Sequence, residues 1–315
     1  MKTGKISESV YNRSCLKQFE KEQFIKKEDA GTSCVFFSDM CFETQTFGLN
    51  HETVVSHAIF LAANQVLAKK AVPKVAMIQV VLTTRQSESF LKKIMKQASE
   101  TLKKYEMLLG SLQVEVVEAV MAPIATVSVV GMGKEDFLAE PGLDIVMAGG
   151  IAMGATATLS HVDEENLSKK YATHFIKKAQ SFFNELNAKD IIKDGKEAQA
   201  MYAVGKGGVF ASLWEMAQKA GVGMTIDLKA IPIKQEAIEV CEVYDINPYE
   251  ALGTGAVLFF TREGDNLVEK LTQNGHLANV IGKTTNSNDR VLLNGEETRF
   301  LEPAKPDEIL KVINK

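Results

Sequence analysis

The length, composition and charge of the chain exclude several classes of protein. It has 315 residues, 45% of them hydrophobic, which suffices for two domains of ~100 to 200 residues with packed cores. Its 36 basic and 40 acidic residues give a formal charge of −4, so nucleic acid is not expected as a partner, and four cysteines are too few for a disulfide framework. An apolar signal segment is missing, and glycines interrupt the longest uncharged run, residues 145–161, so we expect a cytoplasmic protein without a membrane partner.

Strand and helix patterns alternate through the first half of the chain, as in an α+β domain. Hydrophobic periodicity predicts, in order, a strand at 33–37, a helix at 52–71, a strand at 74–82, a helix from Ser87 to Gly110, and strands at 112–120 and 125–130. Ser87 precedes an apolar stripe at helical spacing and is expected to cap its helix. Turn-forming and charged residues cluster from Gly131 to Gly142, which places the boundary near residue 138 and predicts the domains 1–138 and 139–315.

Glycine-containing turns separate the predicted helices and strands of the second half of the chain. The predicted order is a strand at 144–147, a glycine turn at 149–154, a helix at 166–188, a helix at 209–220, a strand at 222–226, a helix through Val243, and strands at 256–260 and 278–283. Gly149 and Gly154 have the spacing of a phosphate-binding loop, but Ala155-Thr156 stands where Lys-Ser/Thr would neutralise phosphate and hold magnesium. The turn is therefore not predicted to be such a loop.

The order of these turns resembles a known family. Gly207-Gly208-Val209, Gly221-Val222-Gly223, Ile231-Pro232, Asn247-Pro248 and Gly255 occur in the order of the R-G-G, G-hydrophobic-G, I-P, D-P and Gly-rich motifs of the AIR (aminoimidazole ribonucleotide) synthase-related superfamily. The hydrogenase-maturation, or HypE-like, branch looks nearest. The resemblance implies a two-domain α+β fold, with an N-terminal dimerising sheet or barrel domain that binds nucleotide and a C-terminal α/β sandwich domain. It also implies a homodimer.

The resemblance further implies ATP bound in the N-terminal domain, with Mg²⁺ held by aspartates, because this hard cation prefers oxygen ligands. Phe37-Ser38-Asp39-Met40 matches the family's T-T-D-S/M, so Asp39 is the candidate metal ligand. Glu28-Asp29-Ala30 stands for the first acidic cluster, G-D-D-A. Asn64-Gln65-Val66 stands for N-D-hydrophobic, with the carboxylate replaced by the amide of Gln65, a weaker magnesium ligand.

The residues expected to bind the cofactor also include the second-half turn. Lys206 stands where the family commonly has arginine, and its ammonium can pair with phosphate or remain a solvated turn residue. The full set of candidates is Asp39, Asp29, Asn64, Lys206, Gly207 and Gly208. No catalytic residue is assigned.

Three functions remain open at this point. The chain is an ATP-dependent enzyme of the hydrogenase-maturation type, a protein that binds ATP or another phosphorylated small molecule with weakened or lost catalysis, or a dimeric pseudoenzyme that acts as an interaction or regulatory module. Hydrogenase-maturation members end in a cysteine that receives the carbamoyl group, and this sequence finishes in Asn314-Lys315. Cys241 lies in an apolar helical stretch, so it is expected to be a core residue.

Overall fold

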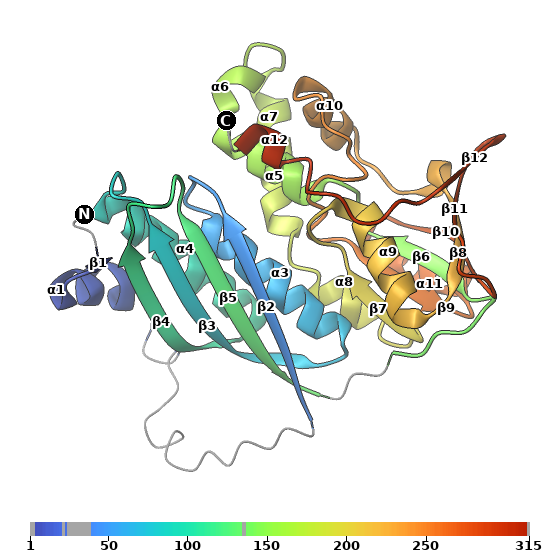
Figure 1. The fold of residues 1–315 in the computed structure, drawn as a ribbon, viewed down its shortest axis with the longest axis horizontal. Coiled ribbons are helices and arrows are strands. Elements are labelled where there is room, and N and C mark those ends of the chain that lie inside the picture. Colours follow the sequence, from blue (N-terminus) through green and yellow to red (C-terminus); the bar gives the residue numbers. More distant parts are fainter. Residues whose placement is uncertain (1–3, 21–22, 24–38, 134–136, 314–315) are drawn as a thin grey trace. The chain divides into compact units, whose positions relative to one another are not determined.

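The computed structural model describes residues 4–20, 23, 39–133 and 137–313. The chain divides into two compact units, Met1–Glu135 and Asp136–Lys315, which we call unit 1 and unit 2. Each unit contains one β-sheet with helices packed against it (Figure 1), and the α+β class expected from the sequence is confirmed. The boundary at residue 138 and the assignment of nucleotide binding to the first domain stay predictions. Within the described residues, none of the helices combines the length and the apolarity that a membrane span requires.

The sheet of unit 1 has five strands in the order β1-β4-β3-β5-β2. They are β1 (Gly4–Lys5), β2 (Met40–Gly48), β3 (Val72–Leu82), β4 (Leu108–Val116) and β5 (Ile124–Met132). β3 and β4 are parallel and are connected through α4 (Glu88–Tyr105), whereas β5 pairs antiparallel with both β3 and β2. α3 (Val54–Ala68) packs against β5, β2, β3 and α4, which explains why all but two of its residues are buried.

A short N-terminal segment packs against α4. It comprises α1 (Glu8–Val10), a π-helical turn at Tyr11–Cys15 and a 3₁₀ turn at Leu16–Gln18. Arg13 and the Ser14 hydroxyl both donate to Glu88 at the start of α4, at 2.5 and 2.6 Å. These bonds lower the pKa of Glu88 to about 2, first through Arg13 and then through Ser14. The segment is thereby tied to the helix that connects β3 and β4.

The face of this sheet opposite α3 carries exposed apolar side chains. We call it the open face and define it by Phe42, Val72, Met77, Val130 and Met132, which lie in register on β2, β5 and β3. Phe42 is 48% exposed, Val72 53%, Met77 39% and Met132 57%. Further along the same strands the face becomes polar, with hydroxyl pairs Thr44–Ser128 at 2.7 Å and Thr46–Thr126 at 2.9 Å.

The sheet of unit 2 has seven strands in the order β12-β11-β8-β10-β6-β9-β7. They are β6 (Asp144–Ala148), β7 (Ala200–Ala203), β8 (Gly223–Asp227), β9 (Val257–Thr261), β10 (Ala278–Thr285), β11 (Arg290–Asn294) and β12 (Glu297–Phe300). The helices are α5 (Met153–Val162), α6 (Glu164–Leu167), α7 (Thr173–Ser181), α8 (Lys189–Asp194), α9 (Gly208–Ala220), α10 (Gln235–Val243), α11 (Gly264–Gln273) and α12 (Leu310–Ile313), with 3₁₀ turns at Phe182–Glu185 and Leu228–Ala230.

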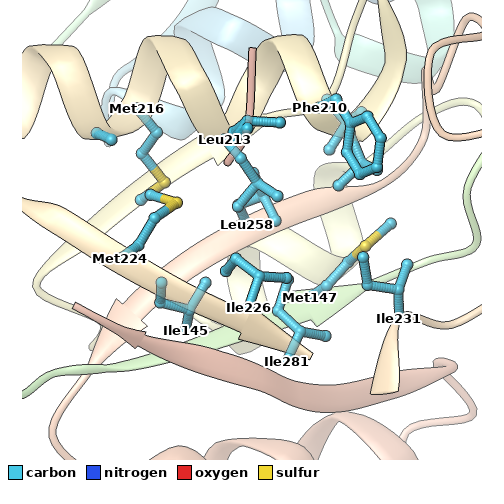
Figure 2. Close-up of a cluster of buried hydrophobic side chains, with 14 of the residues drawn as sticks. Ile145, Met147, Phe210, Leu213, Met216, Met224, Ile226, Ile231, Leu258 and Ile281 are labelled. Carbon is cyan, nitrogen blue, oxygen red and sulfur yellow. The ribbon is translucent and has the colours of Figure 1, made fainter. Parts of the chain in front are cut away.

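The core of unit 2 lies between α9 and the sheet. Figure 2 shows Leu213 and Met216 of α9 facing Met224, Ile226 and Leu258 of the strands. The neighbouring residue Phe259 points to the other face, where its ring lies against Gly195 at the end of α8. Because both faces of β9 are covered, the strand reads as an uninterrupted apolar run.

Two predicted helices were wrong in extent. The helix from Ser87 was expected to reach Gly110, but α4 ends at Tyr105, with Glu106 in the left-handed conformation, and Leu108 already pairs with Val75 of β3. Strand pairing therefore overrides the local helical pattern, and β4 begins four residues before the predicted strand at 112–120. The capping role of Ser87 is confirmed, since its hydroxyl accepts from the Phe90 N–H at 3.1 Å.

The helix expected at 166–188 is interrupted. α6 ends at Leu167, Ala172 is extended, and α7 is followed by a 3₁₀ turn. The Tyr171 hydroxyl, next to the interruption, donates to Glu239 of α10 at 2.8 Å, and its ring stacks on Phe175. These tertiary contacts fix the break. The strand expected at 33–37 lies outside the described residues.

Candidate functional site

Asp39, the carboxylate predicted to bind metal, lies at the beginning of β2. Its side chain is exposed, and its backbone carbonyl accepts from the Gly133 N–H at 2.9 Å. An added Cβ on Gly133 would lie 2.8 Å from Ala71 Cα, so this corner also touches the Lys70–Ala71 turn after α3. Lys70 has a φ of 60°, a left-handed conformation that residues other than glycine rarely adopt.

Asn64 is held inside the helical layer of unit 1. Its side chain is 1% exposed, and its Oδ1 accepts from the Tyr105 hydroxyl of α4 at 2.6 Å. Burial raises the pKa of Tyr105 well above its ordinary value, so the phenol stays a donor at neutral pH. The predicted ligand Asn64 thus fastens α3 to α4.

The magnesium donors that the family implies fit only in part. Asp39 supplies one exposed carboxylate, Gln65 of α3 is half-buried, and the Asn64 oxygen already accepts from Tyr105. Across residues 4–20, 23, 39–133 and 137–313, no group of three or more His, Cys, Asp and Glu side chains has the arrangement of a metal site. Asp29 and Glu28 lie outside these ranges. The described donors alone do not make a magnesium site.

In unit 2, the turn predicted to bind phosphate is bonded to the C-terminal segment. The Gly207 N–H, at the start of α9, donates to Asp307 Oδ2 at 2.8 Å. Asp307 Oδ1 accepts from the N–H groups of Leu252 and Ile309, both at 3.0 Å. Burial raises the pKa of Asp307, and the three N–H bonds and Lys206 oppose this shift. An internal carboxylate therefore takes the position that an anion would occupy at this helix terminus.

The next residue, Glu308, is hydrogen-bonded to the Asn247-Pro248 turn. Glu308 Oε2 accepts from the N–H of Asn247, the residue of the Asn247-Pro248 corner, at 3.2 Å, and from Lys311 at 2.6 Å. Ile309 is 1% exposed. A small cavity of about 110 Å³ remains between the Gly207 turn and residues 299–305. We call residues 301–309 the C-terminal strap, because they connect both corners.

The other motif glycines permit close backbone contacts. Gly149 has a φ of 82°, and an added Cβ would lie 2.9 Å from Ala256 Cα and 3.0 Å from the Gly255 carbonyl. Gly208 has a φ of 66°, and its added Cβ would lie 2.4 Å from the Tyr249 carbonyl oxygen. Such separations exclude a side chain, so these glycines are required for packing.

The described cysteines are buried thiols. Cys241 is 1% exposed, and its pKa is raised to about 12, mainly by burial and further by Asp307 and Glu308. Burial also raises the pKa of Cys15 to about 12. Cys41 is buried, and its Sγ lies 3.3 Å from the Gly133 carbonyl. With these raised pKa values, Cys15 and Cys241 are protonated at neutral pH and react slowly as nucleophiles.

The sequence did not indicate the residues that bond the Gly207 turn or line the pocket of unit 2. It did not single out Asp307, because an acid in a polar C-terminal stretch has no local signal. It also missed Asp190, Lys234 and His276, which line a pocket of unit 2 with a volume of about 410 Å³. These residues come from three separate segments, and only the fold brings them together.

Comparison with known proteins agrees with this architecture. Residues 140–293 match the family model described as AIR synthase related protein, C-terminal domain. Over these residues, just under half of its length, the chain belongs to the AIR synthase-related superfamily. Within it the resemblance is to the HypE-like branch. A protein of Methanocaldococcus jannaschii named for hydrogenase expression and formation is 25% identical over 245 residues, covering 75% of this chain and 71% of its own.

Solved structures of this superfamily share the two-domain fold. E. coli HypE superposes with a TM-score of 0.76 at 16% identity, covering 96% of this chain and 98% of its own. A HypE structure in complex with ATP superposes with a TM-score of 0.70 at 12% identity, covering 96% of both chains. These similarities confirm the AIR-synthase-like fold expected from the sequence.

Proposed function

We propose that the chain is a HypE-like protein that binds ATP or another phosphorylated small molecule, with weakened or lost turnover. The observation that carries this proposal is the side chains that α3 has at the expected ligand positions. Gln65 replaces the family's carboxylate, and the adjacent Asn64 is committed to Tyr105 in the core. Among the described candidates, Asp39 alone remains as a charged oxygen ligand. A site with fewer carboxylates neutralises a triphosphate less well and holds magnesium more weakly.

Two of the described cysteines, Cys15 and Cys241, support the loss of turnover. A thiol with a pKa of about 12 has only a minute thiolate fraction at neutral pH, so Cys15 and Cys241 are poor acceptors for a carbamoyl group. ATP is the first ligand to test, because a HypE structure of the same fold contains it. The cytoplasmic location remains a prediction.

The melting temperature of the full chain tests nucleotide binding. We expect ATP with Mg²⁺ at tenfold excess over Kd to add about 1.4 kcal/mol to the unfolding free energy and to raise Tm by roughly 2–4 °C. Asp39→Asn is expected to reduce this shift, whereas Glu100→Gln, which removes an exposed carboxylate from α4, should preserve it. Absence of any shift with ATP, ADP or AMP would contradict the proposal. Hydrolysis that depends on Asp39 would show that catalysis has survived.

A second candidate function is that of a dimeric interaction module, and the open face of unit 1 favours it. Four of its apolar side chains are between 39% and 57% exposed on one continuous sheet surface. Exposed apolar patches of this kind are typical of protein interfaces. A second copy of the chain fits because the family resemblance implies a homodimer through this domain.

Light scattering of the full chain tests the dimer. We expect a dimer at micromolar concentration and at least a tenfold weaker association for Phe42→Glu, because the substitution removes an apolar contact and introduces a charge into the interface. Phe300→Glu is the matched control, since Phe300 is an exposed aromatic residue, 66% accessible, on β12 of unit 2. A monomeric wild-type chain, or equal weakening by both substitutions, would show that the open face is not the dimer interface.

A further inference from the structure

A pocket of unit 2 lies at one end of three adjacent strands. β6 ends at Ala148, which pairs with Val257 at the beginning of β9 and with Ala278 at the beginning of β10. The connections at this end supply the walls: the Gly149–Gly150 turn before α5, Gly255 before β9 and residues 274–277 before β10. Lys234 and the 184–191 segment complete the pocket of about 410 Å³. Such a volume accommodates a small polar molecule.

Two basic side chains of the pocket are held in place by carboxylates. Lys234 Nζ lies 2.6 Å from Glu185 and 4.6 Å from the centre of the Phe182 ring. His276 Nε2 lies 3.3 Å from Asp194, which also accepts from Asn274 at 2.9 Å. Both basic side chains therefore already have a carboxylate partner.

Asp190 is the exception among the charged side chains of the pocket. It lies in the first turn of α8, its side chain is exposed, and it forms no ion pair or hydrogen bond through that side chain within the described residues. Its carboxylate therefore presents an uncompensated negative charge to the pocket. An ammonium group is the ligand group that this position favours.

A negatively charged ligand group is favoured at the start of α5. Gly150 and Met153 line the pocket, and the N–H of neither donates a backbone hydrogen bond within the part of the chain that the structure describes. An added Cβ on Gly150 would lie 3.7 Å from Lys234 Cγ, so the lysine stem passes close to this turn. Unpaired N–H groups at the beginning of a ten-residue helix attract a carboxylate.

We propose that this pocket binds a small zwitterion with amino-acid chemistry, its ammonium group on Asp190 and its carboxylate at the Gly150 turn. A phosphate dianion fits less well, because Glu185 and Asp190 are both carboxylates of the same wall segment while Lys234 and His276 are already paired. All the residues that line the pocket belong to unit 2.

Saturation-transfer NMR with the full chain at neutral pH tests the proposal. Each of the twenty amino acids is offered separately at millimolar concentration, and the strongest binder is compared with its methyl ester and its deaminated analogue. We expect signal for at least one amino acid and at least tenfold weaker binding when either charged group is removed. If none gives a signal, or if the ester or the deaminated acid binds as well, the proposal is wrong.

Two substitutions locate the ligand in this pocket. Asp190→Asn is expected to weaken binding at least tenfold. Asp265→Asn is the matched control, because Asp265 also lies exposed in the first turn of a helix, α11, but outside the pocket. The melting temperature verifies that both variants fold. Equal affinity in wild type and Asp190→Asn would place the ligand elsewhere and overturn the assignment.

Discussion

Gly208→Ala is expected to destabilise unit 2 by about 2–5 kcal/mol. An L-residue in the left-handed conformation costs roughly 1–2 kcal/mol. The new Cβ would also lie 2.4 Å from the Tyr249 carbonyl oxygen and 2.7 Å from that of Ala251, so backbone must move. This movement breaks the bond from the Phe210 N–H to the Tyr249 carbonyl, now 3.1 Å, and disturbs the stacked Phe210–Tyr249 pair. Repacking of this kind adds roughly 1–3 kcal/mol.

Gly221→Ala at the other end of α9 is the matched control. Gly221 has a φ of 67°, almost the same as Gly208, but no atom lies within 4 Å of its added Cβ. Only the backbone strain remains, roughly 1–2 kcal/mol. Urea unfolding followed by fluorescence of Trp214, the single tryptophan of the chain, reports on unit 2 specifically. Equal losses in the two variants would show that the contact with Tyr249 does not matter.

Asp307→Ala is expected to lower the unfolding free energy of unit 2 by about 2–4 kcal/mol. The substitution leaves the N–H groups of Gly207, Leu252 and Ile309 without their acceptor. Each buried orphaned donor costs about 1–3 kcal/mol. Removal of a carboxylate whose burial is unfavourable offsets part of this loss, as its raised pKa shows.

The control and the pH dependence make this expectation specific. Glu302→Ala removes a nearby exposed carboxylate, 67% accessible, and should change stability by no more than about 0.5 kcal/mol. Because the folded pKa of Asp307 lies above its ordinary value of 3.8, the folded state takes up this proton first as pH falls. The stability that wild type has over Asp307→Ala should therefore increase between the raised pKa and 3.8. A decrease over that range, or equal effects of both substitutions, would contradict the account of the strap.

Local patterns predicted much of the fold where propensity and tertiary structure agree. The helix expected at 209–220 is α9, and Gly221 ends it in the left-handed conformation. The strand expected at 256–260 is β9, shifted by one residue. In both, an apolar period is bounded by glycine, so local sequence determines the element and its end. α4 was overextended because the pairing of Leu108 with Val75 depends on residues more than thirty positions apart.

The candidate site was less predictable, for a physical reason. Asn64 matches a ligand motif, yet its role depends on Tyr105, a residue whose proximity the sequence does not reveal. Gly207 was expected to meet phosphate, but the partner of its N–H is Asp307, a hundred positions away. Hydrogen-bond partners over such separations are set by topology. The binding roles predicted for the whole set stay predictions: Asp39, Asp29, Asn64, Lys206, Gly207 and Gly208.

The contact between Gly149 and the Gly255–Ala256 corner bears on how distant proteins are assigned to activities. The Gly149 turn and the Gly255–Ala256 turn are over a hundred positions apart in sequence, yet their main chains are in contact. A side chain at Gly149 would not fit against the other turn. Selection for a stable protein would preserve both turns even after chemistry had been abandoned. When the activity of a divergent homologue is inferred, the acidic ligand positions should therefore count for more than the conserved order of glycines. The acidic residues take part in the reaction, whereas the glycines are required for the fold.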